Sequence, residues 1–194
     1  MQGPILAFDC SAAHCAAALL SGGRIVTHVE MMAKGQAERL VPMLDEVLAG
    51  QGVVWADLSA IVVGVGPGNF TGIRIAVALA RGLALGLGVP AIGVTGFEAM
   101  ADGALLPVTV VLDAPRGQAY VQPFTQAGPG VAGIVERPPE TGRRMADMDL
   151  AEFMAGLVRV GRAKAAVDQP RPAPFYLRSA DAVPASDPPP VILP

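Results

Sequence analysis

Residues 66–74 read GPGNFTGIR, and this stretch decides the fold because it joins a buried strand to a nearly all-apolar helix. Its three glycines permit positive φ angles and close backbone approach, and Asn69 or Thr71 can cap the helix that follows. No Lys-Ser/Thr pair of a P-loop follows, and Thr71 stands where G-x-G-x-x-G requires its last glycine. The pattern favours a strand-to-helix connection, with an anion or partner site at the helix N-terminus as the functional alternative. The turn comprises Gly66, Pro67, Gly68, Asn69, Phe70, Thr71 and Gly72.

The helix predicted after this turn, residues 71–87, carries only two charged residues, Arg74 and Arg81. A helix that is apolar almost all round is normally buried on two faces. One face can pack on a sheet, and small residues let a second helix approach closely on either side. These small residues form two ridges, Ala76, Ala80 and Ala84 on one side and Ala78, Gly82 and Gly86 on the other. Because 52% of the residues are hydrophobic and 16% charged, we expect the second face to be covered by another protein chain.

Several function classes are disfavoured by composition. The apolar segment 75–89 is short, glycine-rich and interrupted by Arg81, which does not fit a bilayer helix of roughly 20 residues. The first residues, MQGPILAFD, do not resemble a secretory signal, so a cytoplasmic protein is expected. The net charge of −3 leaves no basic stripe for binding RNA by this chain alone.

Metal and protease sites are also disfavoured. Cys10 and Cys15 are the only cysteines and lack metal-site spacing, so buried or semi-buried free thiols are expected. The two histidines, His14 and His28, fall on different predicted strands without a zinc motif, and no Gly-x-Ser-x-Gly elbow occurs.

Outward from the turn, the sequence predicts an α/β lobe. A β-branched run at 61–65 precedes the turn, and a further buried strand, 91–94, follows the apolar helix. Thr95 and Glu98 match a capping box for a helix through Met100. Upstream, apolar or alternating runs predict an antiparallel meander of strands at 4–9, 14–20 and 24–30. Residues 36–48 predict an amphipathic helix with Leu40, Met43, Leu44, Val47 and Leu48 at helical spacing.

A second hairpin repeats the first. Strands at 107–113 and 118–124, with an aspartate ending the first of them, resemble the pair at 4–9 and 14–20. Such duplication predicts two related lobes, the second one reduced to this hairpin, a helix at 149–158 and a short strand at 164–167. Prolines dominate from Gln169 onward and predict an extended tail that forms no further packed element. The expected division is 1–104, 105–168 and 169–194.

Asp9 and Ser11 end the first strand. A carboxylate and a hydroxyl at this position could face a phosphate or its magnesium ion, which makes both residues candidate nucleotide contacts. The alternative is an Asx-type turn that closes the hairpin. The sequence leaves both possibilities open.

Five segments together resemble the TsaB (YeaZ) family. They are ILAFDCS (5–11), AERLVPMLDEVL (37–48), VVGVGPGNFTGIRIAVALARGLALGLGVPAIGVT (62–95), LDAPRGQAYVQ (112–122) and FYLR (175–178). Members of the family are often described as glycoprotease-like or M22 peptidase-like. The resemblance implies an actin-like ATPase (ASKHA) fold of two RNase H-like lobes with mixed sheets. Asn69 stands where the family usually has serine, and both side chains can cap a helix.

The resemblance also implies a division of labour in bacterial threonylcarbamoyladenosine synthesis. TsaC-like enzymes make threonylcarbamoyl-adenylate, TsaD-like enzymes transfer the group to adenosine 37 of ANN-decoding tRNAs, and TsaE-like proteins supply ATPase function. A TsaB-like chain is the noncatalytic dimer partner of TsaD. The histidines that bind the TsaD metal have no counterpart here, where the first helix opens with Gln36. An independent ATP-binding or peptidase-like hydrolase is the competing hypothesis.

The family's dimer interface lies on the apolar helix and the amphipathic helix before it. The residues that this implies are Leu40, Met43, Leu44, Val47, Ile73, Arg74, Val77, Ala80, Arg81 and Ala84. The chain alone is expected to need no cofactor and to form a homodimer, whereas ATP or ADP with magnesium, a TsaE-like ATPase and tRNA are reached only within the complex.

Overall fold

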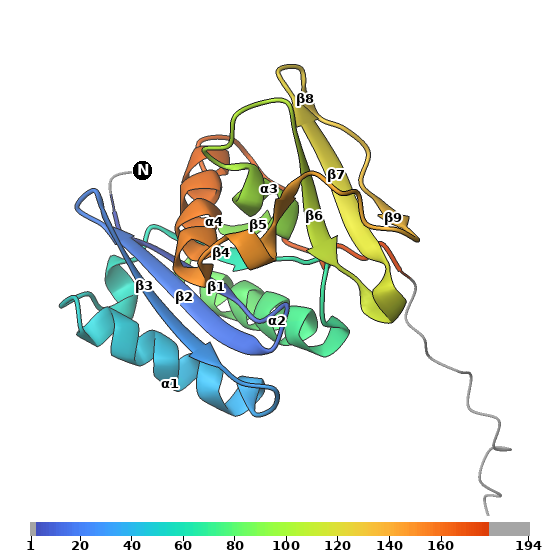
Figure 1. The fold of residues 1–194 in the computed structure, drawn as a ribbon. Coiled ribbons are helices and arrows are strands. Elements are labelled where there is room, and N and C mark those ends of the chain that lie inside the picture. The colour runs from blue at the N-terminus through green and yellow to red at the C-terminus, as the bar shows by residue number, and fades with distance from the viewer. Residues whose placement is uncertain (1–2, 179–194) are drawn as a thin grey trace, which may run out of the picture.

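Five strands form the first sheet of the computed structural model, which describes residues 3–178 (Figure 1). Their order is β3-β2-β1-β4-β5, with β1 to β3 antiparallel and β1, β4 and β5 parallel. The strands are β1 (Ile5–Asp9), β2 (His14–Ser21), β3 (Arg24–Met31), β4 (Ala60–Gly64) and β5 (Ala91–Val94). This sheet confirms the predicted meander and the two buried strands on either side of the apolar helix.

Helices cover both faces of this sheet, as Figure 1 shows. On one face lie α1 (Gln36–Ala49) and α2 (Phe70–Leu87), and on the other α3 (Gly96–Ala101) and α4 (Leu150–Lys164). Because side chains alternate along a strand, Leu6 and Phe8 of β1 join the core beside α1 and α2, while Ile5 and Ala7 join the core beside α3 and α4. The Thr95 and Glu98 capping box at the start of α3 is confirmed.

The second sheet is built on the second hairpin. Its order is β10-β6-β7-β8, with β9 also paired to β7. The strands are β6 (Val108–Asp113), β7 (Ala119–Thr125), β8 (Gly128–Pro129), β9 (Gly133–Val135) and β10 (Arg143–Arg144), and the short 3-10 helices are η1 (Trp55–Asp57), η2 (Pro115–Gly117) and η3 (Met145–Asp147). The antiparallel pair β6 and β7 repeats the pair β1 and β2, and each first strand ends in an aspartate, Asp113 and Asp9.

The last helix differs from its prediction. Asp149 caps α4 as its side chain accepts from the Ala151 N–H, and the helix continues to Lys164, so the predicted strand at 164–167 is wrong. In this last part of the helix Gly161 lies against Val62 of the first sheet, where an added Cβ would stand 2.4 Å from the Val62 side chain. Helix α4 packs on β1, β2 and β3 and on α3, although the predicted division at 104 and 105 assigned it to the second lobe.

The proline-rich segment also differs. Residues 169–178 form no helix or strand, yet they pack on the body of the protein. Pro172 is buried, and the Phe175 N–H donates to the Val65 carbonyl at 2.8 Å. The Phe175 ring contacts both cores, which explains why an extended segment is held here. The remainder of the predicted tail, 179–194, lies outside the described residues.

Candidate functional site

The glycine turn packs directly on the first hairpin. A Cβ atom added to Gly68 would lie 2.2 Å from the Ser11 carbonyl oxygen, and one added to Gly72 would lie 1.9 Å from the Cys10 carbonyl oxygen. The Asn69 N–H donates to the Ser11 carbonyl at 2.6 Å. The glycines therefore serve a close approach between two segments of the protein.

Asn69, and not Thr71, caps α2. Its Oδ1 accepts a hydrogen bond from the Gly72 N–H at 2.9 Å. Gly66, at φ 98°, and Pro67 are buried, Phe70 is half-buried, and Gly68, Asn69 and Thr71 are exposed. Because the N–H groups of Asn69 and Gly72 already have protein acceptors, an anion at this turn would have to use the other N–H groups of the first helical turn.

Asp9 is held inside the hairpin turn and is only 1% exposed. Its Oδ1 accepts hydrogen bonds from the N–H and the hydroxyl of Ser11, both at 2.8 Å, and lies 2.8 Å from Nε2 of the buried His14. This geometry matches the Asx-type turn, one of the two alternatives. Sequence reasoning missed His14; an aspartate and a histidine five residues apart around a tight turn were the available signal.

A cleft of ≈ 310 Å³ lies where the two hairpin turns meet the start of α2. It is lined by Ser11, Ala12, Ala13, Ala33, Gln36, Gly68, Asn69, Asp113, Pro115 and Tyr120. Of the two candidate nucleotide contacts, Ser11 lines this cleft, while the buried Asp9 does not. The Ser11 hydroxyl donates its proton to Asp9, so this side chain offers the cleft only the lone pairs of its oxygen.

Most of the predicted interface side chains face inward. Eight of the ten residues are buried in the core between the helices and the first sheet: Leu40, Met43, Leu44, Val47, Ile73, Val77, Ala80 and Ala84. Only Arg74 and Arg81 are exposed. Helices packed on a sheet turn most of their larger apolar side chains inward, so only the opposite side of these helices is open to contact from outside.

That opposite side, here called the α2 outer face, consists of Arg74, Ala78, Arg81, Gly82, Leu85 and Gly86. Leu85 is 82% exposed, and an added Cβ at Gly82 or Gly86 would meet nothing within 4 Å. The two small-residue ridges predicted from sequence thus lie on opposite sides, with Ala76, Ala80 and Ala84 buried. The outer face is exposed and combines Leu85 and three small residues with the two arginines.

Helix α2 also meets the length and composition of a membrane span, the one helix within residues 3–178 that does. It runs over 18 residues and is longer than the segment 75–89 considered from sequence. A core helix meets the same criteria, and Ile73, Ala76 and Val77 pack α2 into the core beside the first sheet.

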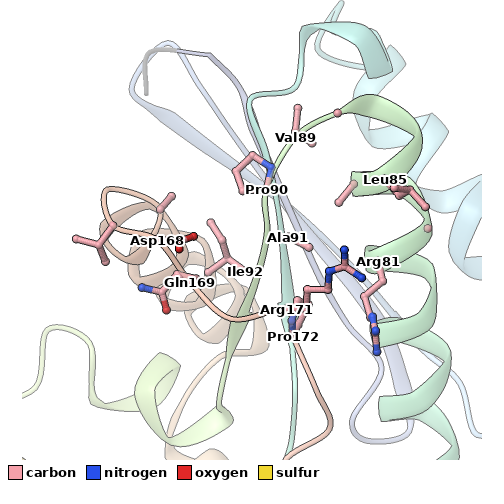
Figure 2. A pocket seen from close by; sticks show the side chains of 15 residues that line it. Arg81, Leu85, Val89, Pro90, Ala91, Ile92, Asp168, Gln169, Arg171 and Pro172 are labelled. Carbon is pink, nitrogen blue, oxygen red and sulfur yellow. The ribbon is translucent and has the colours of Figure 1, made fainter.

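A groove of ≈ 620 Å³ continues from the outer face toward the end of α2 (Figure 2). Arg81, Gly82 and Leu85 belong to both surfaces, and the opposite wall is formed by β5 and residues 165–172, including Arg171. No local sequence pattern predicts this groove, because its walls come from segments about 80 residues apart.

The two cysteines lie side by side across the first hairpin. Their Sγ atoms are 3.6 Å apart and both residues are buried. Burial raises the pKa of both the Cys10 and the Cys15 thiol, so neither is an activated nucleophile. The prediction of buried free thiols is confirmed.

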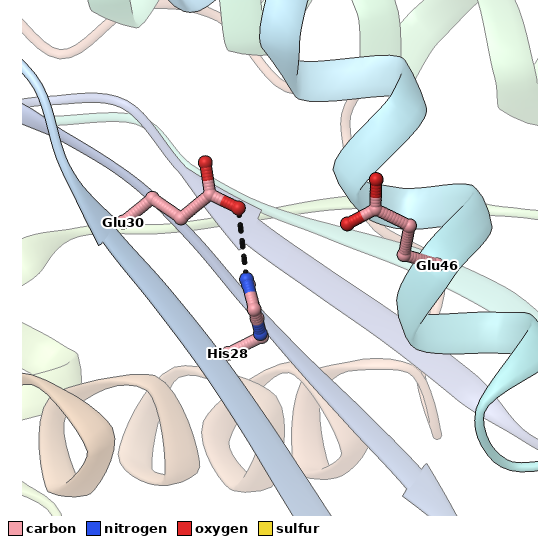
Figure 3. A group of neighbouring side chains, drawn as sticks. All are labelled: His28, Glu30 and Glu46. Atoms are coloured by element: carbon pink, nitrogen blue, oxygen red, sulfur yellow. Dashed lines mark hydrogen bonds and ion pairs between the residues drawn. The ribbon is translucent and has the colours of Figure 1, made fainter.

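An ion-pair network joins β3 to α1. His28, Glu30 and Glu46 converge, and Figure 3 shows the His28–Glu30 contact, 2.9 Å long. Arg39 donates from Nε to Glu30 at 2.8 Å and from Nη1 to Glu46 at 2.7 Å. A metal ion bound here would have to displace this guanidinium, which already supplies the positive charge. Hydrogen bonds from Arg39 and His28 lower the pKa of Glu30 to about 2.

This network predicts an acid-dependent stability. Because the folded pKa of Glu30 lies below its unfolded value, its contribution is present above about pH 4.5 and is lost as the pH falls toward 2. We expect the unfolding free energy to fall over this range, and to fall less in Arg39→Gln. Urea unfolding followed by circular dichroism at pH 7, 4.5 and 3 measures how the unfolding free energy of each protein changes with pH. An equal change in the wild type and in Arg39→Gln would contradict this role of the Arg39–Glu30 pair.

Comparisons with known proteins extend this picture. The model of the TsaD family, tRNA N6-adenosine threonylcarbamoyltransferase, matches residues 28–136. The "tRNA threonylcarbamoyladenosine biosynthesis protein TsaB" of Escherichia coli (strain K12) is 37% identical over 121 residues, which cover 60% of this chain and 52% of the relative. An uncharacterized protein of Mycobacterium tuberculosis (strain H37Rv) is 34% identical over 171 residues, covering 80% of this chain and 81% of the relative.

The fold has a solved counterpart. "YeaZ from Pseudomonas aeruginosa" superposes with a TM-score of 0.69 at 24% identity, covering 90% of this chain and 100% of that one. This similarity confirms the predicted actin-like fold of two lobes with mixed sheets, the second one smaller. The chain spans about half the length of the TsaB relative from E. coli.

Proposed function

This chain belongs to the TsaB (YeaZ) family, and we propose that it serves tRNA threonylcarbamoyladenosine biosynthesis as a noncatalytic partner of a TsaD-like enzyme. The observation that carries the proposal is the α2 outer face. It combines an exposed leucine with small residues and two arginines, on a helix whose other side is already buried. Uncovered apolar surface beside small residues is the kind of surface that a partner helix covers.

The inward-facing groups also support a scaffold role over an independent hydrolase. Asp9, the carboxylate at the end of β1, is committed to Ser11 and His14, and the thiols of Cys10 and Cys15 have raised pKa values. We propose that ATP or ADP with magnesium, a TsaE-like ATPase and tRNA are engaged only by the assembled complex. In this proposal the chain is cytoplasmic and pairs with a second copy when the TsaD-like partner is missing.

The test is assembly with the TsaD-like protein of the same organism. We expect Gly82→Glu to weaken assembly more than tenfold, because a charged side chain would stand between the two helices. Gly82→Ala is the matched control and should assemble like the wild type. Ala80 is unsuitable for this purpose, since it is 0% exposed and a charge there would unfold the chain. Co-purification with a tagged TsaD-like protein gives the readout, and full assembly by Gly82→Glu would rule out the outer face.

A further inference from the structure

We propose that Arg74 anchors the α2 outer face by receiving a carboxylate from an acidic helix of the partner protein, while Phe70 and Tyr176 hold its guanidinium in position. The inference rests on the proposed assembly with a TsaD-like chain. It assigns one residue of the outer face a specific role and brings in Tyr176, a residue of the C-terminal segment.

The Arg74 guanidinium is fixed from two directions. Its Cζ lies 3.7 Å from the centroid of the Phe70 ring, and its Nε–H donates to the Tyr176 hydroxyl at 3.0 Å. Phe70 and Tyr176 stack on each other with ring centroids 4.9 Å apart and an interplanar angle of 27°. Stacking orients the guanidinium plane, and the hydrogen bond sets its rotation within that plane.

Tyr176 is itself held by the body of the protein. The neighbouring Phe175 donates its N–H to the Val65 carbonyl at 2.8 Å, and its ring contacts both hydrophobic cores. Tyr176 is 38% exposed and lies at the protein surface beside the start of α2. The C-terminal segment therefore carries a fixed side chain to Arg74.

The end of the guanidinium remains available. Arginine has five N–H donors, and here the Nε–H is used by Tyr176. Among residues 3–178, no acceptor is paired with Nη1 or Nη2 of Arg74. An arginine fork that is already oriented loses less conformational entropy when it binds a carboxylate through two parallel hydrogen bonds.

The charge of the outer face indicates what binds it. Residues 66–87 contain Arg74 and Arg81 and no acidic residue. Seven residues on an α-helix make about two turns, so the two arginines share one face at a separation of roughly 10 Å. Ala78 and Gly82 lie on the same face, and their small size lets a partner backbone approach. A helix with carboxylates about two turns apart is the complementary surface.

Arg81 provides a matched comparison. It lies on the same helix and face and is exposed like Arg74, but within the described part of the chain no aromatic ring stacks on it. Replacing either arginine with lysine keeps the charge and removes the fork. A difference in Kd between the two replacements therefore reports on the fixed orientation of the Arg74 guanidinium and not on the charge of the face.

The experiment is calorimetric titration of the full-length chain with the purified TsaD-like protein. We expect Arg74→Lys to raise Kd about tenfold, Tyr176→Phe about threefold, and Arg81→Lys less than about twofold. Thermal unfolding of each variant is measured in parallel. Tyr176→Phe keeps the ring stack and removes only the acceptor, so it tests positioning even if Arg74→Lys lowers stability.

Two results would overturn the inference while the wild type still binds. One is an equal effect of Arg74→Lys and Arg81→Lys, and the other is an unchanged Kd in Tyr176→Phe. If the wild-type chain does not bind the TsaD-like protein at all, the proposed function itself fails, and with it this role of Arg74.

Discussion

Replacing Gly72 with alanine is expected to lower the free energy of unfolding by about 3 kcal/mol or more. The added Cβ would lie 1.9 Å from the carbonyl oxygen of Cys10. The obstacle is a backbone atom, so no change of rotamer can relieve the clash. The first turn of α2 would have to move away from the hairpin, which would also disturb the hydrogen bond from the Asn69 N–H to the Ser11 carbonyl.

Gly82→Ala is the control for this prediction, since it makes the same change in the same helix. An added Cβ at Gly82 meets nothing within 4 Å, and alanine favours a helix over glycine by about 1 kcal/mol. We therefore expect opposite signs for the two variants in urea unfolding followed by circular dichroism. A Gly72→Ala protein as stable as the wild type would mean that the turn is not packed on the hairpin.

The sequence predicts most of the elements because their signals are local. Alternation places β1, β2 and β3, and apolar periodicity places α1. The cap at Asn69 and the Thr95 and Glu98 capping box mark the starts of α2 and α3. Each of these signals depends on residues within one turn or one strand, so no knowledge of distant contacts is required.

The direction of the α2 side chains could not be predicted in the same way. Residues 75–87 are apolar or small on every side except for Arg81, so hydropathy does not distinguish the buried Ala80 from the exposed Gly82. What turns Ala80 inward is the packing of α2 against the first sheet. Most of the interface side chains that the family resemblance indicated are instead buried in the core of the chain itself.

Contacts between distant segments could not be predicted from the sequence either. From the sequence alone, the glycines of the turn could also form an anion-binding loop. The sequence does not show that the carbonyls of Ser11 and Cys10 occupy the space beside Gly68 and Gly72. The prolines after Gln169 predict an unpacked tail, because the contacts that dock residues 169–178, such as those of Phe175, are made with segments far away in the sequence. Such contacts depend on the tertiary fold.

Asp9→Ala is expected to lower the free energy of unfolding by about 3 kcal/mol. The Asp9 carboxylate is 1% exposed, and its Oδ1 is the acceptor for the N–H and hydroxyl of Ser11 and the neighbour of His14 Nε2. Removing it leaves these polar groups at a buried turn without their partner. Asp9→Asn keeps an oxygen that can accept from Ser11, so its loss should be smaller, about 1 kcal/mol.

Unfolding of the two variants also separates the two alternatives for Asp9. If the carboxylate served mainly to hold a phosphate or its magnesium ion, its removal would relieve an unpaired charge, and the empty chain would keep or gain stability. If the carboxylate closes the hairpin, both variants are less stable than the wild type, and Asp9→Ala loses more stability than Asp9→Asn. This holds with or without added ATP and magnesium. Gly64 is packed so closely on Asp9 that an added Cβ would lie 1.8 Å from Oδ2, which leaves the carboxylate little room for another ligand. We therefore expect both variants to be less stable than the wild type, and Asp9→Ala to be the less stable of the two.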